Sequence, residues 1–218
     1  MTAIVPFKGN LPATTLREKV LARLADGTAP VVHGGSRLYV RFNGNTGAMS
    51  AGKDNTSIGK DDLFLISAGL ARHGVMEWVG KKPSGQKRLV PFIDGWAPSI
   101  PVGALIKGSD ADRPLEGWAD TVILDMVGYG GDFDGIALEF ALHADSAREA
   151  GIKVVDAMFT RLKHGETHFN ACVRIGVDSY MNTKWSRDIF YPVFEIVGWA
   201  SDDDVQMLAD ASDDDPLA

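Results

Sequence analysis

The chain has 218 residues, of which 45% are hydrophobic and 23% are charged, as is ordinary for a globular protein that buries a core. A single cysteine, Cys172, excludes an internal disulfide, and no apolar run reaches the roughly 18 residues of a membrane-spanning helix. The 29 acidic and 22 basic residues give a formal net charge of −7. Residues 1–15 lack the layout of a secretory signal, so we expect a cytoplasmic protein.

The first regular element expected is a short amphipathic helix between Thr15 and Gly27. Thr15 and Glu18 have the spacing of a capping box, and Gly27 stands where such a helix would end. From residue 37 onward, polarity alternates with period two, which predicts strands. The predicted strands cover residues 37–42, 62–67, 75–79, 87–92, 118–127 and 135–143. The stretches 52–62 and 80–86 are rich in glycine and polar residues and are predicted to be loops.

A second helix is predicted over residues 144–163, with Ser146 as its cap and Glu149 at the capping-box position. Its apolar stripe contains Ile152, Val155, Met158, Phe159 and Leu162. Two more strands are expected at 168–177 and 189–199. Pro192 lies inside the second of these, which predicts an edge strand or a bulge.

These elements predict a β-dominated α+β fold. The specific expectation is an OB-like, partly open antiparallel barrel with insertions and two helices. We expect residues 1–200 to form a single nucleic-acid-binding domain. Residues 201–218 contain seven aspartates and no basic residue, which predicts a disordered acidic C-terminal tail. Without this tail the chain has 22 acidic and 22 basic residues, so the domain itself is formally neutral.

The strand at residues 37–42 places arginine and tyrosine side chains on one face. Because side chains alternate across a strand, Arg37, Tyr39 and Arg41 should face away from the apolar residues between them. Cations that pair with phosphates and rings that stack on bases are typical of surfaces that bind single-stranded nucleic acid. The alternative interpretation is a solvated sheet face without a ligand.

Two further stretches mix basic and aromatic residues. One contains Trp78, Lys81, Lys82, Lys87 and Arg88, and the other contains Tyr180, Lys184, Trp185 and Arg187. Exposing a tryptophan in a polar loop is costly unless the ring binds something, so Trp185 is the aromatic residue that most favours a binding surface. The alternative for Trp185 is a ring folded back onto the core. Since the domain is neutral overall, any nucleic-acid site must come from clustering of these residues.

No stretch of the sequence predicts an active site or a metal site. Asp132 and Asp134 lie in a glycine-rich stretch that lacks the further oxygen ligands of a calcium site, and we interpret it as a solvated turn. His164, His168 and Cys172 would share one face of a helix, but β-alternation begins there and argues against a helix. Residues 52–62 do not match a phosphate-binding loop. We therefore expect neither an enzyme nor a bound cofactor.

The C-terminus resembles the acidic tip of bacterial single-stranded-DNA-binding proteins, which usually reads Asp-Asp-Asp-Ile-Pro-Phe. Asp213, Asp214, Asp215 and Pro216 match this tip in type and order, whereas Leu217 and Ala218 depart from its ending. Bacteriophage proteins with the same role combine an OB-fold body with an acidic extension. The stretches DSYMN and YPVFEIVGW are also similar to phage proteins encoded among replication and recombination functions. The resemblance implies a tail that competes for the DNA groove and recruits replication or recombination proteins through residues 213–217.

The leading hypothesis is therefore non-sequence-specific binding of single-stranded DNA in phage replication or recombination, in the cytosol of the host. One alternative is a virion or assembly protein whose acidic tail controls oligomerisation. A third is a DNA mimic that inhibits a host enzyme, because residues 110–145 hold nine acidic residues against Arg113 alone. The predicted partners are single-stranded DNA and replication proteins but no membrane, and self-association stays open.

Overall fold

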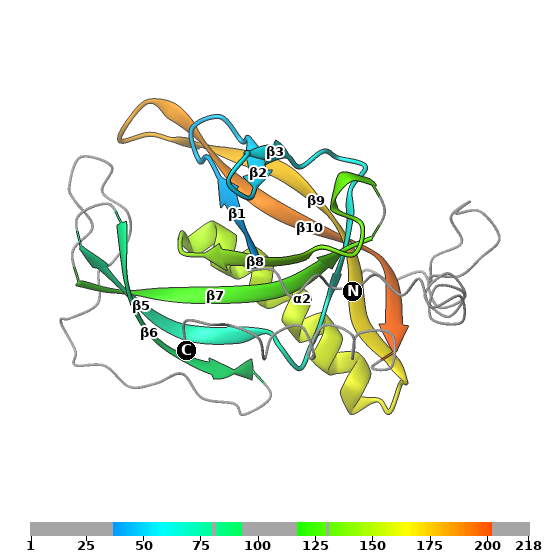
Figure 1. Ribbon diagram of the computed structural model, residues 1–218. Coiled ribbons are helices and arrows are strands. Elements are labelled where there is room, and N and C mark those ends of the chain that lie inside the picture. Colours follow the sequence, from blue (N-terminus) through cyan, green and yellow to red (C-terminus); the bar gives the residue numbers. More distant parts are fainter. Residues whose placement is uncertain (1–36, 80–81, 93–116, 130, 202–218) are drawn as a thin grey trace.

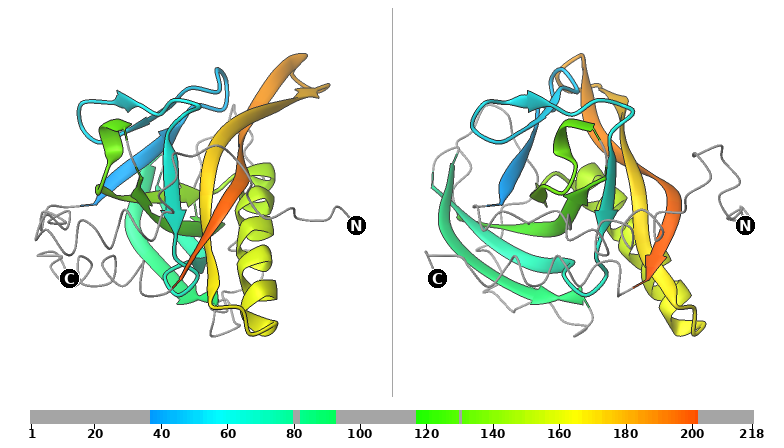
Figure 2. Two further views of the ribbon diagram at one scale, coloured as in Figure 1. Left: turned by 90° about the vertical axis from the view of Figure 1, so that its right-hand side faces the viewer. Right: turned by 45° about the vertical axis from the view of Figure 1, so that its right-hand side comes forward.

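A computed structural model describes residues 37–79, 82–92, 117–129 and 131–201 (Figure 1). The fold is β-dominated α+β: a large sheet curls into an open half-barrel, and one α-helix packs against it (Figures 1 and 2). This confirms the predicted fold class and the partly open barrel. The helix predicted between Thr15 and Gly27 and the acidic tail from residue 202 lie outside the described residues.

Ten strands, one α-helix and one 3-10 turn make up the described part of the chain. They are β1 (Leu38–Phe42), β2 (Met49–Ala51), β3 (Thr56–Ser57), β4 (Leu63–Ile66), β5 (Arg72–Val79), β6 (Lys82–Pro91), β7 (Gly117–Gly128), η2 (Gly131–Phe133), β8 (Ala137–Leu142), α2 (Asp145–Lys163), β9 (His168–Asn182) and β10 (Arg187–Ser201). Every strand predicted from alternation is present.

The loop predicted at residues 80–86 is wrong over most of its length. β6 begins at Lys82, which pairs directly with Val79 of β5, so the two strands form a hairpin. The pairing with β5 fixes the backbone here, although the Gly, Pro and Ser residues disfavour a strand locally. The other predicted loop, residues 52–62, holds only the two-residue β3.

The strand order is β10-β9-β4-β7-β8-β1-β2-β3, with β5 paired to β7 and β6 paired to β5. The pairs are antiparallel except for β1 with β8, where Leu38 pairs with Leu138. The turn after β1 reaches the opposite end of this order, because the Phe190 N–H donates a hydrogen bond to the Gly44 carbonyl at 2.9 Å. The curl of the sheet therefore brings the turn after β1 into contact with the outer edge of β10.

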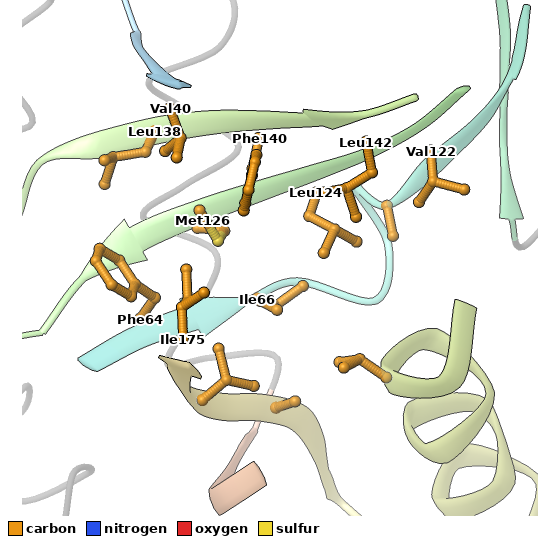
Figure 3. Close-up of a cluster of buried hydrophobic side chains, with 14 of the residues drawn as sticks. Val40, Phe64, Ile66, Val122, Leu124, Met126, Leu138, Phe140, Leu142 and Ile175 are labelled. Atoms are coloured by element: carbon orange, nitrogen blue, oxygen red, sulfur yellow. The ribbon is translucent and has the colours of Figure 1, made fainter. Parts of the chain in front are cut away.

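The main core lies between the curled sheet and α2 (Figure 3). Alternate residues of β7 face it, namely Val122, Leu124 and Met126, and they meet Phe64 and Phe140 from neighbouring strands. Five residues of α2 are buried against the sheet: Ala147, Gly151, Val154, Val155 and Met158. A Cβ at Gly151 would lie 2.5 Å from a Leu142 methyl carbon, so a larger residue here would have to displace the Leu142 side chain.

Two details of the helix prediction differ in the structure. The N-cap is Ala144, which makes no side-chain capping bond, and not Ser146. The helix begins at Asp145, so Ser146 already lies in its first turn, where Asp145 supplies negative charge near the helix start. Ile152, expected in the buried stripe, is exposed.

Pro192 stands in a strand at the end of the described strand order, as its position in the sequence predicts. The Phe190 N–H points away from β9, since it bonds Gly44. Backbone groups alternate in direction along a strand, so the nitrogen of Pro192 also points away from β9. The proline therefore removes no hydrogen bond from the β9–β10 pairing.

The pairing of β9 with β10 continues further than the sequence pattern indicates. It runs to Asn182 and Arg187, five residues past the predicted end of the earlier strand, and residues 183–186 form the turn. We call residues 176–193 the arm, because this part of the hairpin projects from the body beyond β1 and β2 (Figures 1 and 2).

Candidate nucleic-acid interface

The tip of the arm brings three of the predicted binding residues together. The Lys184 ammonium lies 5.6 Å from the centre of the Trp185 ring, and the Arg187 guanidinium lies 5.3 Å from it. The Asn182 carboxamide oxygen accepts hydrogen bonds from the backbone N–H groups of Lys184 and Trp185, at 3.0 and 3.2 Å, and shapes the turn. Lys184 and Arg187 are exposed, and Trp185 is half-buried.

Aromatic side chains continue along the arm toward the body. The rings of Tyr180 and Tyr191 lie 6.2 Å apart, and the Tyr191 hydroxyl donates a hydrogen bond to Asp178 Oδ2 at 3.0 Å. This hydrogen bond and the negative charge of Asp178 raise the pKa of Tyr191. Tyr180 itself is exposed. The arm therefore offers rings at its tip and along one face, next to two cations.

The strand β1 confirms the predicted alternation. The core is contacted by Leu38, Val40 and Phe42. The side chains of Arg37, Tyr39 and Arg41 therefore lie on the other face of the strand. Tyr39 is exposed, and Arg41 is exposed with its guanidinium 2.6 Å from the Asn55 side-chain oxygen. Arg37 differs, because its guanidinium lies 2.6 Å from Asp125 Oδ1. The charge of Arg37 is thus balanced inside the protein.

Arg37 belongs to a group of four charged residues, which we call the ionic cluster: Arg37, Arg72, Asp125 and Glu139. Asp125 and Glu139 are paired neighbours on β7 and β8, and both are buried. Arg72 Nη2 lies 2.8 Å from Asp125 Oδ2 and 3.1 Å from Glu139 Oε2. Loss of hydration raises the pKa of Asp125, and this outweighs the two guanidiniums, which lower it. The cluster lies on the sheet face opposite α2, since Asp125 alternates with core-facing Leu124 and Met126.

Arg72, Asp125 and Glu139 were not predicted as site residues from the sequence. A signal was present: Asp125 interrupts the apolar run TVILDMV and Glu139 interrupts IALEFAL. A single carboxylate within a buried strand is rare unless a cation pairs with it. Two such strands predict a buried ionic contact, although not the arginines that complete it.

The cluster around Trp78 is dispersed over the β5–β6 hairpin. The Trp78 ring packs edge-on against His143 at 4.8 Å, and its indole nitrogen is buried. Arg88 lies 5.2 Å from the centre of the Trp118 ring, and Lys87 is exposed. Burial, assisted by the charge of Arg148, lowers the pKa of His143 to about 4, so this imidazole is neutral at pH 7. Lys81 and the side chain of Lys82 lie outside the described residues.

The three predicted clusters therefore do not form one described surface. The turn after β1 contacts the arm through Gly44 and Phe190, so Arg41 and the arm lie on neighbouring elements. The end of the β5–β6 hairpin lies apart from the arm in all three views (Figures 1 and 2). The arm is the described element where several predicted residues meet.

The acidic segment 110–145 is largely neutralised where the structure describes it. Asp125 and Glu139 belong to the ionic cluster, and Asp120 and Asp145 both pair with Arg148. Asp132 is exposed, as expected of a solvated turn. Phe133 beside it is buried, so the turn as a whole is not solvated. The remaining acidic residues before Gly117 lie outside the described residues. A DNA-mimicking surface gains no support from these contacts.

The histidine and cysteine residues near the end of α2 do not share a helix. The helix ends at Lys163, and β9 begins at His168, as the alternation predicts. Burial raises the pKa of the Cys172 thiol to about 12. Within the described ranges, no three His, Cys, Asp or Glu side chains gather in a way that could hold a metal ion. Nor does any helix in those ranges combine the length and apolarity needed to cross a bilayer.

Comparison with known proteins identifies no relative: no protein-family model, no curated protein and no solved structure matches this chain.

Proposed function

We propose that this protein binds single-stranded DNA without sequence preference, as a non-catalytic factor in phage replication or recombination in the host cytosol. The observation that carries the proposal is the tip of the arm, where two exposed cations lie close to the Trp185 ring on a projecting hairpin. Single strands are bound by rings that stack on bases beside cations that pair with phosphates, and neither contact requires a particular base. Tyr180, Tyr39 and Arg41 extend the candidate surface toward β1.

Replacing Trp185 by alanine should weaken binding to an oligo-dT strand. Stacking of one base on an aromatic side chain contributes about 1–3 kcal/mol, so we expect about a fivefold to 150-fold higher dissociation constant. The measurement is fluorescence anisotropy of a labelled oligo-dT at low salt. No binding by the unaltered protein under these conditions would refute the proposal.

Two arginines in matched surroundings test whether the arm is the site. Arg187 and Arg88 are both exposed, and each lies over a half-buried tryptophan, at 5.3 and 5.2 Å. Arg187→Ala should reduce the salt dependence of binding by about 0.7 in log–log slope, the value for one phosphate contact to a single strand. Arg88→Ala should leave the slope unchanged. An equal effect of the two variants would place DNA on the β5–β6 hairpin as well.

The acidic tail is proposed to compete with DNA for the cations and to recruit replication or recombination proteins. Deleting residues 202–218 removes seven negative charges and no positive one. A tethered competitor acts at an effective concentration on the order of millimolar, so its removal should tighten binding to oligo-dT at low salt. The effect should disappear at high salt, where both charge interactions are screened. Unchanged affinity at low salt would exclude competition by the tail.

A further inference from the structure

Exposed apolar side chains gather on the outer half of β9. Six large hydrophobic residues are exposed in the described part of the chain, and three of them are Val177, Tyr180 and Met181. Met181 is 59% exposed and Tyr180 is 45% exposed. Because side chains alternate across a strand, Val177 and Met181 lie on one face of β9 and Tyr180 lies on the other, so exposed apolar side chains flank this strand on both faces.

Among the described strands, none pairs with this part of β9 on the side away from β10, and we call this side its open edge. On the side away from β10, the pairing with β4 ends where Leu63 meets Arg174, and no described strand lies beside residues 175–182. Phe190 pairs with Ser179, and the Phe190 N–H points away from β9. In an antiparallel ladder, two residues that lie directly opposite each other turn their backbone N–H and C=O groups either both inward or both outward. The backbone groups of Ser179 therefore face the open edge. Those of Val177 and Met181, two positions away on either side, do so as well.

A side-chain hydrogen bond agrees with this direction. The Ser179 N–H donates to the Asp178 carboxylate at 2.7 Å. The outer edge of β10, by contrast, is interrupted by Pro192 and contacted by Gly44. Prolines and covering loops prevent an edge strand from pairing with another chain. In the described part of the chain, the β9 edge carries neither feature between Asp178 and Asn182.

We propose that a second copy of this chain pairs antiparallel with this edge, with Tyr180 opposite Tyr180 of the second copy. In this register Ser179 lies opposite Met181, so the outward backbone groups of both copies form four hydrogen bonds. The two tyrosines form a cross-strand aromatic pair, which adds to the backbone pairing. The contact is isologous, as is usual for a twofold dimer.

Charge complementarity selects this register over its neighbours. With Tyr180 at the centre, Asp178 lies diagonally across from Lys184 of the second copy, within reach of a long side chain. With Ser179 at the centre, Asp178 would lie diagonally across from Asp178 of the second copy, which places like charges together. With Met181 at the centre, Ser179 would lie opposite Thr183, where the strand has already become a turn. This inference does not rest on DNA binding.

Disulfide trapping tests the register directly. Tyr180→Cys should form a covalent dimer with oxidised glutathione, because directly opposite residues have Cα atoms roughly 4.4–6.8 Å apart, as a disulfide requires. Met181→Cys is the matched control: this position is even more exposed, but it lies opposite Ser179 and should cross-link several-fold more slowly. The native Cys172 should stay silent, because its thiol is buried and its pKa is raised to about 12.

A backbone variant tests the edge without altering the apolar surface. Ser179→Pro removes an outward N–H and costs no bond to β10, as Pro192 already shows on the opposite strand. Sedimentation should show a dimer for the unaltered protein and for Ser179→Ala, and a monomer for Ser179→Pro with an unchanged circular dichroism spectrum. A monomeric unaltered protein, or equal cross-linking at positions 180 and 181, would overturn the proposal.

Discussion

Replacing Arg72 by methionine is expected to lower the free energy of unfolding by about 3–5 kcal/mol. Arg72 contacts both carboxylates of the ionic cluster, whose side chains are only 6% and 7% exposed. Without it, the remaining guanidinium of Arg37 lies 2.6 Å from Asp125 but 3.9 Å from Glu139. A buried carboxylate that loses its partner keeps the full cost of its lost hydration. Urea unfolding followed by tryptophan fluorescence measures the loss.

Arg148 supplies a matched control for this substitution. Its side chain is 23% exposed, against 24% for Arg72, and it also pairs with two carboxylates. Those carboxylates belong to Asp120 and Asp145, which are 51% and 77% exposed. Water can therefore solvate them when the arginine is removed, and Arg148→Met should cost no more than about 1 kcal/mol. Equal losses for the two variants would contradict the burial argument.

Replacing the whole ionic cluster should be far less harmful than breaking it. A variant with Arg37→Met, Arg72→Met, Asp125→Leu and Glu139→Met leaves no buried charge without a partner. We expect it to recover most of the stability lost in Arg72→Met. Such recovery would show that the cost lies in unpaired charge and not in lost side-chain volume.

Phe133→Ala is expected to cost about 3–5 kcal/mol, as is typical when a buried phenylalanine is truncated. Phe133 is 1% exposed, and its ring lies 6.0 Å from that of Phe64, which is fully buried. The backbone holds it there, because the Ile136 N–H donates to the Phe133 carbonyl at 2.9 Å. A neighbouring backbone that is fixed in this way limits how far the cavity can collapse. The same urea unfolding experiment measures the effect.

The control for Phe133 is the adjacent Asp132, which is exposed. Asp132→Ala changes the same short 3-10 turn but removes no buried surface, so it should change stability by no more than about 0.5 kcal/mol. A small effect of Phe133→Ala would mean that this loop is not part of the core. Comparable losses for both variants would point to the turn itself as the stabilising feature.

The candidate site could be predicted only in part from the sequence. Lys184, Trp185 and Arg187 were grouped correctly, because neighbours within one short turn stay close in any fold. Arg37 and Arg88 were grouped with their sequence neighbours, but Arg37 contacts Asp125 and Arg88 lies over the Trp118 ring. Those partners lie 88 and 30 residues away in the chain. Local composition carries no information about contacts at that separation.

Alternation and helical spacing by themselves determined the β-dominated fold class and the direction in which each strand presents its side chains, as in residues 37–42. They do so because burial of one face imposes the period of the element on the sequence. Only the tertiary structure decided that β1 runs parallel to β8, that Asp125 and Glu139 share two arginines, and that the arm extends to Asn182. These features depend on which strands become neighbours in the curled sheet. Along the arm, backbone hydrogen bonding between two partly exposed strands continues the ladder without requiring an apolar pattern.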